Sequence, residues 1–302
     1  MRVPVGKYGH GSYSITYLFY VMIKNLFKYA AALIFLLSAT GCASSYYSYK
    51  QAATSIEEKL PRKSFALIKN SVTIRACFKQ DANKPPICHT GTLAGSSSGM
   101  FVARSEVDAN VSYVLTAGHS CSTDTFKERF SFPSITTEIL KQNLEVVTYY
   151  GKKYRASTVK TQKKHDMCLL YVHDIDRHPR PVQLSSAPPR RGQEVYNLAA
   201  PLGIFYPKMV MTMHGFFSGH DRNGYAHFTI PTKPGSSGSV ILDSTGKIVG
   251  MIFAGYRGIE NIAISSSHAL LSSFLKNTIA MGEMALFASK KMEQQLIIDR
   301  LK

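Results

Sequence analysis

Short apolar runs separated by glycine, proline and asparagine fill the chain from about residue 70 to residue 265. The runs have the length of β-strands, and closely spaced strands with turn residues between them are typical of an all-β sandwich or barrel. Strands are expected at Ser71–Ala76, Ser98–Ala103, Tyr113–Leu115, Leu144–Tyr149, Met167–Val172, Met209–His214, Ala226–Ile230, Ser239–Leu242 and Ile248–Phe253.

A proline-rich stretch and a change in the spacing of the apolar residues divide this pattern. Residues 174–191 contain four of the 13 prolines and predict a linker between two halves. After residue 266 the apolar positions return at helical spacing and predict a helix. The expected organisation is a first β unit over residues 66–178, a second over 179–265 and a helical segment over 266–302.

The N-terminus has the layout of an export signal. Two lysines precede the apolar run Ala30–Leu37, and small residues follow it up to Cys42. A positive region, a short apolar core and small residues before a cut are typical of a signal peptide, and this core is too short to span a membrane comfortably. Residues 1–41 are therefore expected to be a leader. Translation that starts at Met22 would give this leader a more usual length than a start at Met1.

The end of this leader resembles a bacterial lipobox, in which the cysteine is lipidated and becomes the first residue. Thr40-Gly41-Cys42 fits that pattern, whereas Ala39 departs from its preferred leucine. The resemblance implies a membrane anchor at Cys42, a tether or cleaved propeptide over residues 42–65, and a place in the bacterial cell envelope, facing the periplasm or the surface. Cleavage near Ala43 without a lipid is the alternative, and it implies a secreted protein.

Composition and charge narrow the partners. The chain has 302 residues, 45% of them hydrophobic, which suits a globular protein and argues against a disordered one. Its net charge of +17 favours anionic surfaces in general. The basic pairs Lys152–Lys153, Lys163–Lys164 and Arg190–Arg191 are far apart, and no nucleic-acid motif accompanies them. No specific nucleic-acid partner is therefore expected, and the alternative of a nucleic-acid binder rests on charge alone.

Four cysteines follow Cys42, and an even number in an exported chain suggests disulfides. Cys77 and Cys88 flank a Lys-Pro-Pro turn and are the favoured pair. Cys121 and Cys168 either form a second disulfide or remain buried thiols. No Cys-x-x-Cys or His-x-x-x-His spacing supports a metal site, so neither a metal nor a cofactor is expected.

Three short motifs carry candidate chemistry, in the order His, Asp, Ser. His119 follows an apolar strand that breaks at Ala-Gly, Asp166 opens an apolar strand, and Ser237 lies in a glycine turn before a third strand. A serine hydroxyl is a poor nucleophile at neutral pH, so an imidazole has to accept its proton, and a carboxylate fixes the tautomer of that imidazole. The backbone N–H groups of Gly235 and Ser237 are expected to form the hole that binds the developing oxyanion.

These motifs resemble those of the trypsin-like (chymotrypsin-fold) serine peptidases. Leu-Thr-Ala-Gly-His ending at His119 is similar to the family's histidine motif, Asp-Met-Cys-Leu-Leu from Asp166 to its aspartate motif, and Gly-Ser-Ser-Gly-Ser around Ser237 to its serine motif. The likeness covers roughly residues 66–276. It implies two six-stranded antiparallel β-barrels with these three residues as a triad in the cleft between them. The expected activity is that of a serine endopeptidase acting on a polypeptide substrate.

The same resemblance places the pocket for the side chain before the cut bond at residues 230–233 and 252–255. The expected lining residues are Thr232, Ile252, Phe253 and Gly255. Pro231 stands where trypsin carries an acid, and Ile252 stands where glutamate-specific relatives carry a histidine. A small or apolar side chain is therefore expected in this pocket.

Two other interpretations compete with this one. The run Gly95–Gly99 has the form of the nucleophile elbow of α/β-hydrolases, but that elbow needs a helix after its serine, and a β-type run follows Ser97. The second is a catalytically silent trypsin-like fold that acts as an envelope binding module. It stays open, because the sequence does not show whether the oxyanion hole is formed.

Overall fold

The computed structural model describes residues 59–79, 85–129, 135–256 and 258–301. The predicted leader, the start at Met22, the lipidation site Cys42 and most of the predicted tether lie outside the described residues.

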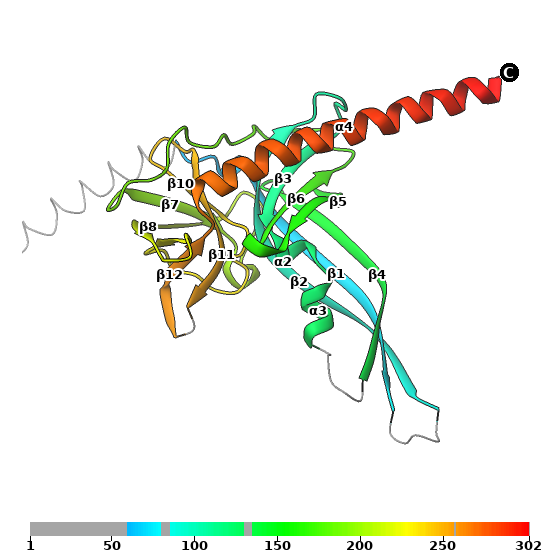
Figure 1. The fold of residues 1–302 in the computed structure, drawn as a ribbon, viewed down its shortest axis with the longest axis horizontal. Coiled ribbons are helices and arrows are strands. Elements are labelled where there is room, and N and C mark those ends of the chain that lie inside the picture. The colour runs from blue at the N-terminus through cyan, green and yellow to red at the C-terminus, as the bar shows by residue number, and fades with distance from the viewer. Residues whose placement is uncertain (1–58, 80–84, 130–134, 257, 302) are drawn as a thin grey trace, which may run out of the picture. The chain divides into compact units, whose positions relative to one another are not determined.

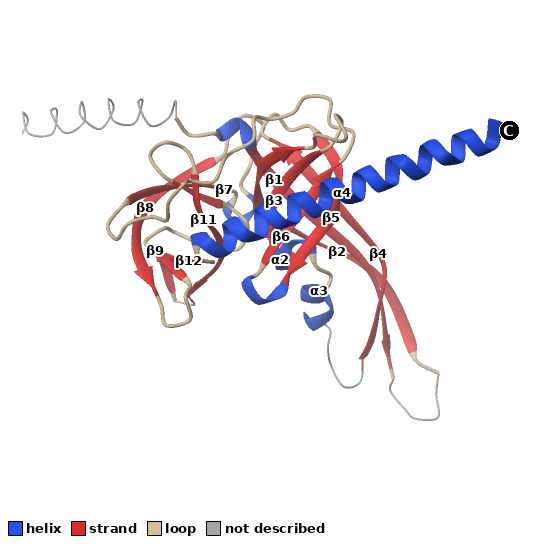
Figure 2. Ribbon diagram, turned by 45° about the horizontal axis from the view of Figure 1, so that its top comes forward, coloured by secondary structure: helices blue, strands red, loops and turns tan. Residues whose placement is uncertain are grey.

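Two closed barrels of six antiparallel strands each make up most of the described chain (Figures 1 and 2). The strand order of the first barrel is β1 (Phe65–Phe78), β2 (Ile87–Arg104), β3 (Ser112–Ala117), β6 (Met167–Val172), β5 (Lys153–Gln162) and β4 (Ile135–Thr148). The order of the second is β10 (Val240–Leu242), β11 (Ile248–Tyr256), β12 (Ile259–Ser265), β9 (Ala226–Phe228), β8 (Met211–His220) and β7 (Glu194–Ala199). The expected all-β fold with two six-stranded barrels is confirmed.

The helices of the described residues are short except for the last. Single 3-10 turns are η1 (Arg62–Ser64), η2 (Lys163–His165) and η3 (Pro201–Gly203), while α2 (Gly118–Cys121) and α3 (Asp124–Arg129) follow β3. The long helix α4 (His268–Leu301) confirms the helix expected after the second barrel. Within the described ranges, no helix combines the length and the apolar character needed to cross a membrane.

Inward-facing apolar side chains fill each barrel, because successive residues of a strand point to opposite faces. The first core contains Ala66, Ile68, Phe101, Val114, Leu144, Val146, Leu170 and Val172, and the second contains Val195, Phe217, Phe228, Ile230, Ile241, Val249 and Ile252. Each large apolar side chain that is fully buried stabilises the fold by roughly 1.5–3 kcal/mol relative to an exposed one.

Three strands of the first barrel are longer than the apolar pattern predicts. β1 pairs with β2 from Phe65 to Phe78, but β2 pairs with β3 only from Gly99 onward. β4 likewise pairs with β1 along its whole length and with β5 only from Leu144. The outer parts of β1, β2 and β4 therefore form a three-stranded ribbon that continues beyond the barrel (Figure 1).

Both pairs of cysteines in the described chain form disulfides. Cys77 and Cys88 lie directly opposite each other on β1 and β2, which confirms the favoured pair. Cys121, at the end of α2, is bonded to Cys168 on β6, so the alternative of two buried thiols is wrong. Neither cysteine of this second pair is more than 3% exposed.

Helix α4 contacts β5 and β6 of the first barrel and β11 of the second. Its first half carries the buried residues Leu271 and Phe274. Gly282 brings the helix backbone close to two tyrosines of the first barrel, and the hydroxyl of Tyr171 donates to its carbonyl oxygen at 2.8 Å. A Cβ atom at Gly282 would lie 2.9 Å from the hydroxyl of Tyr113 and 3.0 Å from that of Tyr171. Glycine is therefore required for this close approach.

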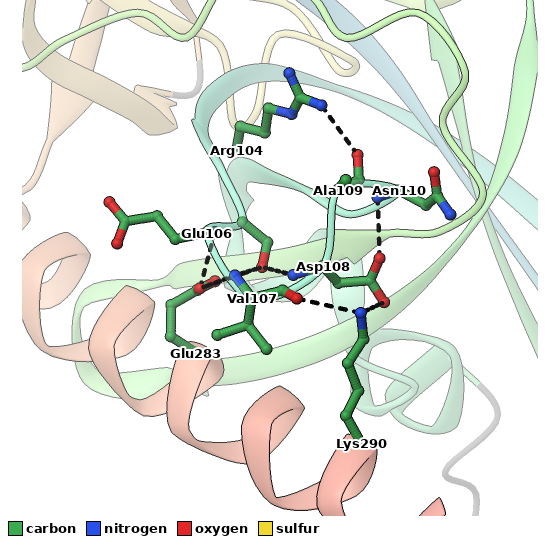
Figure 3. A network of polar contacts seen from close by, with 9 residues as sticks. Arg104, Glu106, Val107, Asp108, Ala109, Asn110, Glu283 and Lys290 are labelled. Carbon is green, nitrogen blue, oxygen red and sulfur yellow. Dashed lines mark hydrogen bonds and ion pairs between the residues drawn. The ribbon is translucent and has the colours of Figure 1, made fainter. Parts of the chain in front are cut away.

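Glu283 anchors the helix to the loop after β2 (Figure 3). Its Oε2 accepts hydrogen bonds from the Ser105 hydroxyl at 3.2 Å and from the backbone N–H groups of Glu106 and Val107 at 3.0 and 3.1 Å. Its Oε1 accepts a short hydrogen bond from the buried hydroxyl of Tyr113. Two turns further on, Lys290 forms an ion pair with Asp108 at 3.3 Å, so the helix is bound to this loop at two points.

Substituting Glu283→Gln is expected to loosen this anchor. Burial alone would raise the pKa of Glu283, but its hydrogen bonds outweigh burial and hold the pKa below its usual value. The stabilisation is therefore complete above the pKa of the unfolded carboxyl and is lost as the pH falls through the lowered folded pKa. We expect the variant to be about 1–2 kcal/mol less stable at neutral pH and to lose less stability than wild type between about pH 5 and pH 3.

Urea unfolding at a series of pH values measures both effects. Glu293→Gln is the matched control, since Glu293 lies on the exposed part of the same helix. Equal losses in the two variants would contradict the anchoring role of Glu283.

Candidate active site

A cavity of about 390 Å³ lies where the two barrels meet. The first barrel and its helices supply Asn70, Ala94, Gly95, Ser96, Ser97, His119, Ser120 and Phe126, and the second half supplies Leu202, Gly203, Pro234, Gly235 and Ser237. His119 and Ser237, which are 118 positions apart in the sequence, therefore line the same cavity.

The pairing of β3 with β6 brings His119 and Asp166 together. Ala117 and Met167 face each other at the ends of these strands, so the residues next to them are neighbours. Oδ2 of Asp166 lies 2.5 Å from Nδ1 of His119, and Oδ1 accepts the backbone N–H of His119 at 2.7 Å. With Nδ1 carrying the proton in this hydrogen bond, Nε2 is left as the acceptor nitrogen of a neutral ring.

Close packing between Gly118 and Asp166 shapes this pair. The N–H of Gly118 donates to the carbonyl oxygen of Asp166 at 2.9 Å, and a Cβ atom at Gly118 would lie 2.8 Å from the carboxylate. Asp166 itself has a φ of 50°, a left-handed conformation that aspartate tolerates better than most residues. Both features hold the carboxylate against the start of α2.

The carbonyl groups of α2 are held by two amide side chains from the first barrel. Nδ2 of Asn70 donates to the carbonyl oxygens of Ser120 and Ser122 at 3.1 and 3.3 Å, and Nε2 of Gln142 donates to that of Cys121 at 2.7 Å. These side chains satisfy the end of the helix that carries His119. Sequence reasoning missed them, because at least 21 residues separate the partners in the chain.

The turn that carries Ser237 is fixed by backbone contacts. Gly235 and Gly238 have φ values of 98° and 82°, which glycine adopts readily. A Cβ atom would lie 2.5 Å from the carbonyl oxygen of Ala200 at the first position and 2.2 Å from that of Ser98 at the second. The N–H of Gly238 donates to Ile252 at 2.7 Å. Glycine is therefore required on both sides of Ser237.

Two backbone N–H groups of this turn have no acceptor within the described part of the chain, namely those of Gly235 and Ser237. The N–H of Leu202 donates to the carbonyl oxygen of Pro234 at 2.6 Å. A planar trans peptide then directs the N–H of Gly235 to the opposite side. These are the two donors that the sequence predicted for an oxyanion.

A second cavity of about 280 Å³ adjoins Ser237. It is lined by Thr232, Lys233, Pro234, Ser236, Ser237, Ile252, Ala254, Gly255 and Tyr256. Three of the four predicted lining residues are among these. The fourth, Phe253, is not, and its ring lies 5.4 Å from that of Tyr225. Lys233, which sequence reasoning missed, forms an ion pair with Glu260 beside this cavity.

No group of three or more potential metal ligands occurs among the residues for which the structure gives positions. All four cysteines of the described chain are in disulfides. The first cavity is lined by an imidazole, His119, and by several serine hydroxyls, including that of Ser237.

Two six-stranded barrels with His, Asp and Ser at their junction define the chymotrypsin-like class. The family model of the trypsin-like peptidase domain matches residues 97–251, just over half of the chain. The chain therefore belongs to the trypsin-like peptidase family, which confirms the resemblance inferred from its motifs. This places it among the serine proteases, whose substrates are polypeptides.

A solved structure agrees with this assignment at the level of the fold. The chain is similar to the crystal structure of the serine endoprotease from Yersinia pestis, with a TM-score of 0.51 and 14% sequence identity over 76% of this chain and 67% of that chain. No curated protein sequence matches. At this identity the structural likeness shows the fold alone.

Removing the disulfide beside the site is expected to cost more stability than removing the distant one. Cys121–Cys168 closes a loop of 47 residues and Cys77–Cys88 one of 11. In the chain-entropy model the double variant Cys121→Ser/Cys168→Ser loses about 4 kcal/mol of unfolding free energy, and Cys77→Ser/Cys88→Ser loses about 3 kcal/mol. Urea unfolding of both variants beside wild type measures the losses. A larger loss for the Cys77–Cys88 variant would contradict the prediction.

Proposed function

We propose that the protein is a serine endopeptidase that hydrolyses peptide bonds through an acyl-enzyme on Ser237. One observation carries this proposal. The carboxylate of Asp166 is hydrogen-bonded to Nδ1 of His119, and His119 lines the same cavity as Ser237. A base with a fixed tautomer beside a serine hydroxyl is the combination that nucleophilic catalysis by serine needs.

The proposed reaction begins when Oγ of Ser237 attacks the carbonyl carbon of the scissile peptide bond. Nε2 of His119 accepts the hydroxyl proton, and the carboxylate of Asp166 stabilises the imidazolium. The negative charge moves to the carbonyl oxygen, which the N–H groups of Gly235 and Ser237 receive. Each such donor typically contributes about 100- to 1000-fold to the rate.

The tetrahedral intermediate then collapses, and the carbon–nitrogen bond breaks. His119 gives its proton to the leaving amine, which departs and leaves the acyl group on Ser237. A water molecule repeats the attack with His119 as the base, and the acid product is released with the Ser237 hydroxyl restored. No oxidant, metal or cofactor takes part in any of these steps.

A fluorophosphonate probe tests the nucleophile. We expect covalent labelling of the folded protein, and its loss in Ser237→Ala, since only a serine activated by a base reacts with the phosphorus atom. Ser97→Ala is the matched comparison, because Ser97 lies in the competing motif and lines the same cavity. Intact-mass spectrometry reads out the label. Labelling lost only in Ser97→Ala would refute Ser237, and no labelling of the folded protein would favour the silent binding module.

The second cavity supports a preference for small side chains before the cut bond. Thr232 and Gly255 face each other so closely that a Cβ atom at Gly255 would lie 2.4 Å from Oγ1 of Thr232. This contact narrows the cavity, and Ile252 gives it an apolar wall. We infer that this contact leaves less space beside Thr232 for a large ring than for a small side chain.

Thr232→Ala is expected to admit larger apolar side chains, because it removes the atom that narrows the cavity. The kcat/KM ratio for leucine over alanine at this substrate position should rise by about 10-fold or more. Thr232→Ser keeps the hydroxyl and should keep the wild-type ratio. A peptide-library profile of the three proteins measures the effect. A strong wild-type preference for arginine or glutamate would overturn it, and a glutamate preference would implicate Lys233.

A further inference from the structure

Ser98 joins the two barrels at the turn that carries Ser237. It lies on β2, it is fully buried, and its backbone N–H donates to the carbonyl oxygen of Ser237 at 2.9 Å. Its hydroxyl donates to the carbonyl oxygen of Gly235 at 2.8 Å and accepts the backbone N–H of Ala200 at 2.9 Å. One side chain thus satisfies the buried N–H of Ala200 and the half-buried carbonyl of Gly235, which belong to two separate segments of the second half.

These two segments also meet each other beside Ser98. Two residues after Ala200, the N–H of Leu202 holds the carbonyl oxygen of Pro234. The peptide before Gly235 is therefore fixed by Leu202, and the peptide after Gly235 is fixed by the Ser98 hydroxyl. The same hydroxyl also holds the N–H of Ala200, two residues before Leu202. It therefore links the segment that holds the peptide before Gly235 to the peptide after it.

We propose that Ser98 is a positioning residue for the oxyanion hole, which holds the N–H of Gly235 in the direction of the developing charge. The inference rests on the proposed function and names a part of its site that none of the sequence motifs assigned. Glycine moves readily between backbone conformations, so Gly235 by itself would not keep its N–H in one direction. Leu202 restrains the peptide before Gly235, and the hydroxyl of Ser98 supplies the second restraint, on the peptide after it.

A positioning role predicts a loss that is specific to the transition state. Without the hydroxyl, the buried Ala200 N–H and the half-buried Gly235 carbonyl lose their partner, and other conformations of the turn become populated. The substrate carbonyl is uncharged in the ground state and gains its charge only on attack, so KM should change little. The expected loss in kcat for Ser98→Ala is about 10- to 100-fold, less than the full loss of one oxyanion donor.

The matched control is Thr116→Val, in the same buried layer. The hydroxyl of Thr116 donates to the carbonyl oxygen of Ser98 at 2.8 Å. It lies beside Gly238, where a Cβ atom would be 2.3 Å from it, and not beside the peptide that carries the Gly235 N–H. Thr116→Val removes one hydrogen bond beside the turn, whereas Ser98→Ala removes two, so Thr116→Val should lower the unfolding free energy by a smaller amount. It should keep kcat within about threefold of wild type.

Steady-state kinetics on a peptide amide, and inhibition by a peptide aldehyde, test the proposal. The aldehyde forms a tetrahedral adduct with the serine, so its affinity should fall by the same factor as kcat in Ser98→Ala. Ser98→Cys keeps a weak donor of similar size and should lie between Ser98→Ala and wild type. If Ser98→Ala does not fold, the kinetics of Ser98→Cys alone test the positioning role. A wild-type kcat in both Ser98 variants, or equal kcat losses in Ser98→Ala and Thr116→Val, would overturn the proposal.

Crystal structures of wild type and the Ser98 variants separate this proposal from the proposed function. A rotated Pro234–Gly235 peptide in the variants would support the positioning role even if wild type proved inactive towards every substrate. An unmoved peptide in the variants would overturn it even if wild type is an active peptidase.

Discussion

The in-register pairing of β3 with β6 is the constraint on which the site depends. Because Ala117 and Met167 end this pairing together, the chain segments that hold His119 and Asp166 leave the sheet side by side. Gly118 has no side chain to keep them apart, so the carboxylate reaches both the ring and the backbone of His119. One carboxylate then sets the position of the imidazole and its tautomer, and the disulfide from α2 to β6 closes the same junction covalently.

The second barrel reaches this pair through backbone contacts, which tolerate little variation. Gly238 lies so close to Ser98 that any side chain there would push the two barrels apart. Ser98 also donates its N–H to the carbonyl oxygen of Ser237 and its hydroxyl hydrogen to that of Gly235. The same short stretch of β2 therefore excludes a side chain at Gly238 and holds the carbonyl of Gly235. The stretch that looks like a hydrolase elbow in the sequence therefore has a structural explanation, since its serine at position 98 supports the turn of Ser237.

The sequence pointed to His119, Asp166 and Ser237 because each lies close to the end of an apolar strand, and the structure brings His119 beside Asp166 and into one cavity with Ser237. The sequence predicted the outer strands poorly. The outer half of β2 is largely exposed, the outer half of β4 alternates between half-buried and exposed residues, β5 has one buried residue, and β12 begins with three exposed ones, so none of these segments shows a continuous apolar run. Contacts of Asn70, Gln142 and Ser98 depend on which distant strands become neighbours, and no local pattern carries that information. Phe253 is different, since strand alternation could have separated its side chain from those of Ile252, Ala254 and Tyr256, which share one cavity. Gly255 has the same parity as Phe253, but it has no side chain and lines the cavity with its backbone.

Two of the strained positions in the described backbone lie at the same junction. Of the four non-glycine residues with positive φ in this backbone, Asp166 provides the proposed acid and Leu202 forms a wall of the cavity. Such conformations cost about 1–3 kcal/mol each and persist only where the surroundings determine them. At Asp166 the determining contacts are with Gly118 and His119, and at Leu202 the contact is with the Pro234 carbonyl. Asp166 orients the imidazole of His119, and Leu202 orients the peptide that carries the Gly235 N–H. The proposed reaction uses both groups. The stability of the barrels offsets the cost of these two strained conformations and so permits the geometry of the site.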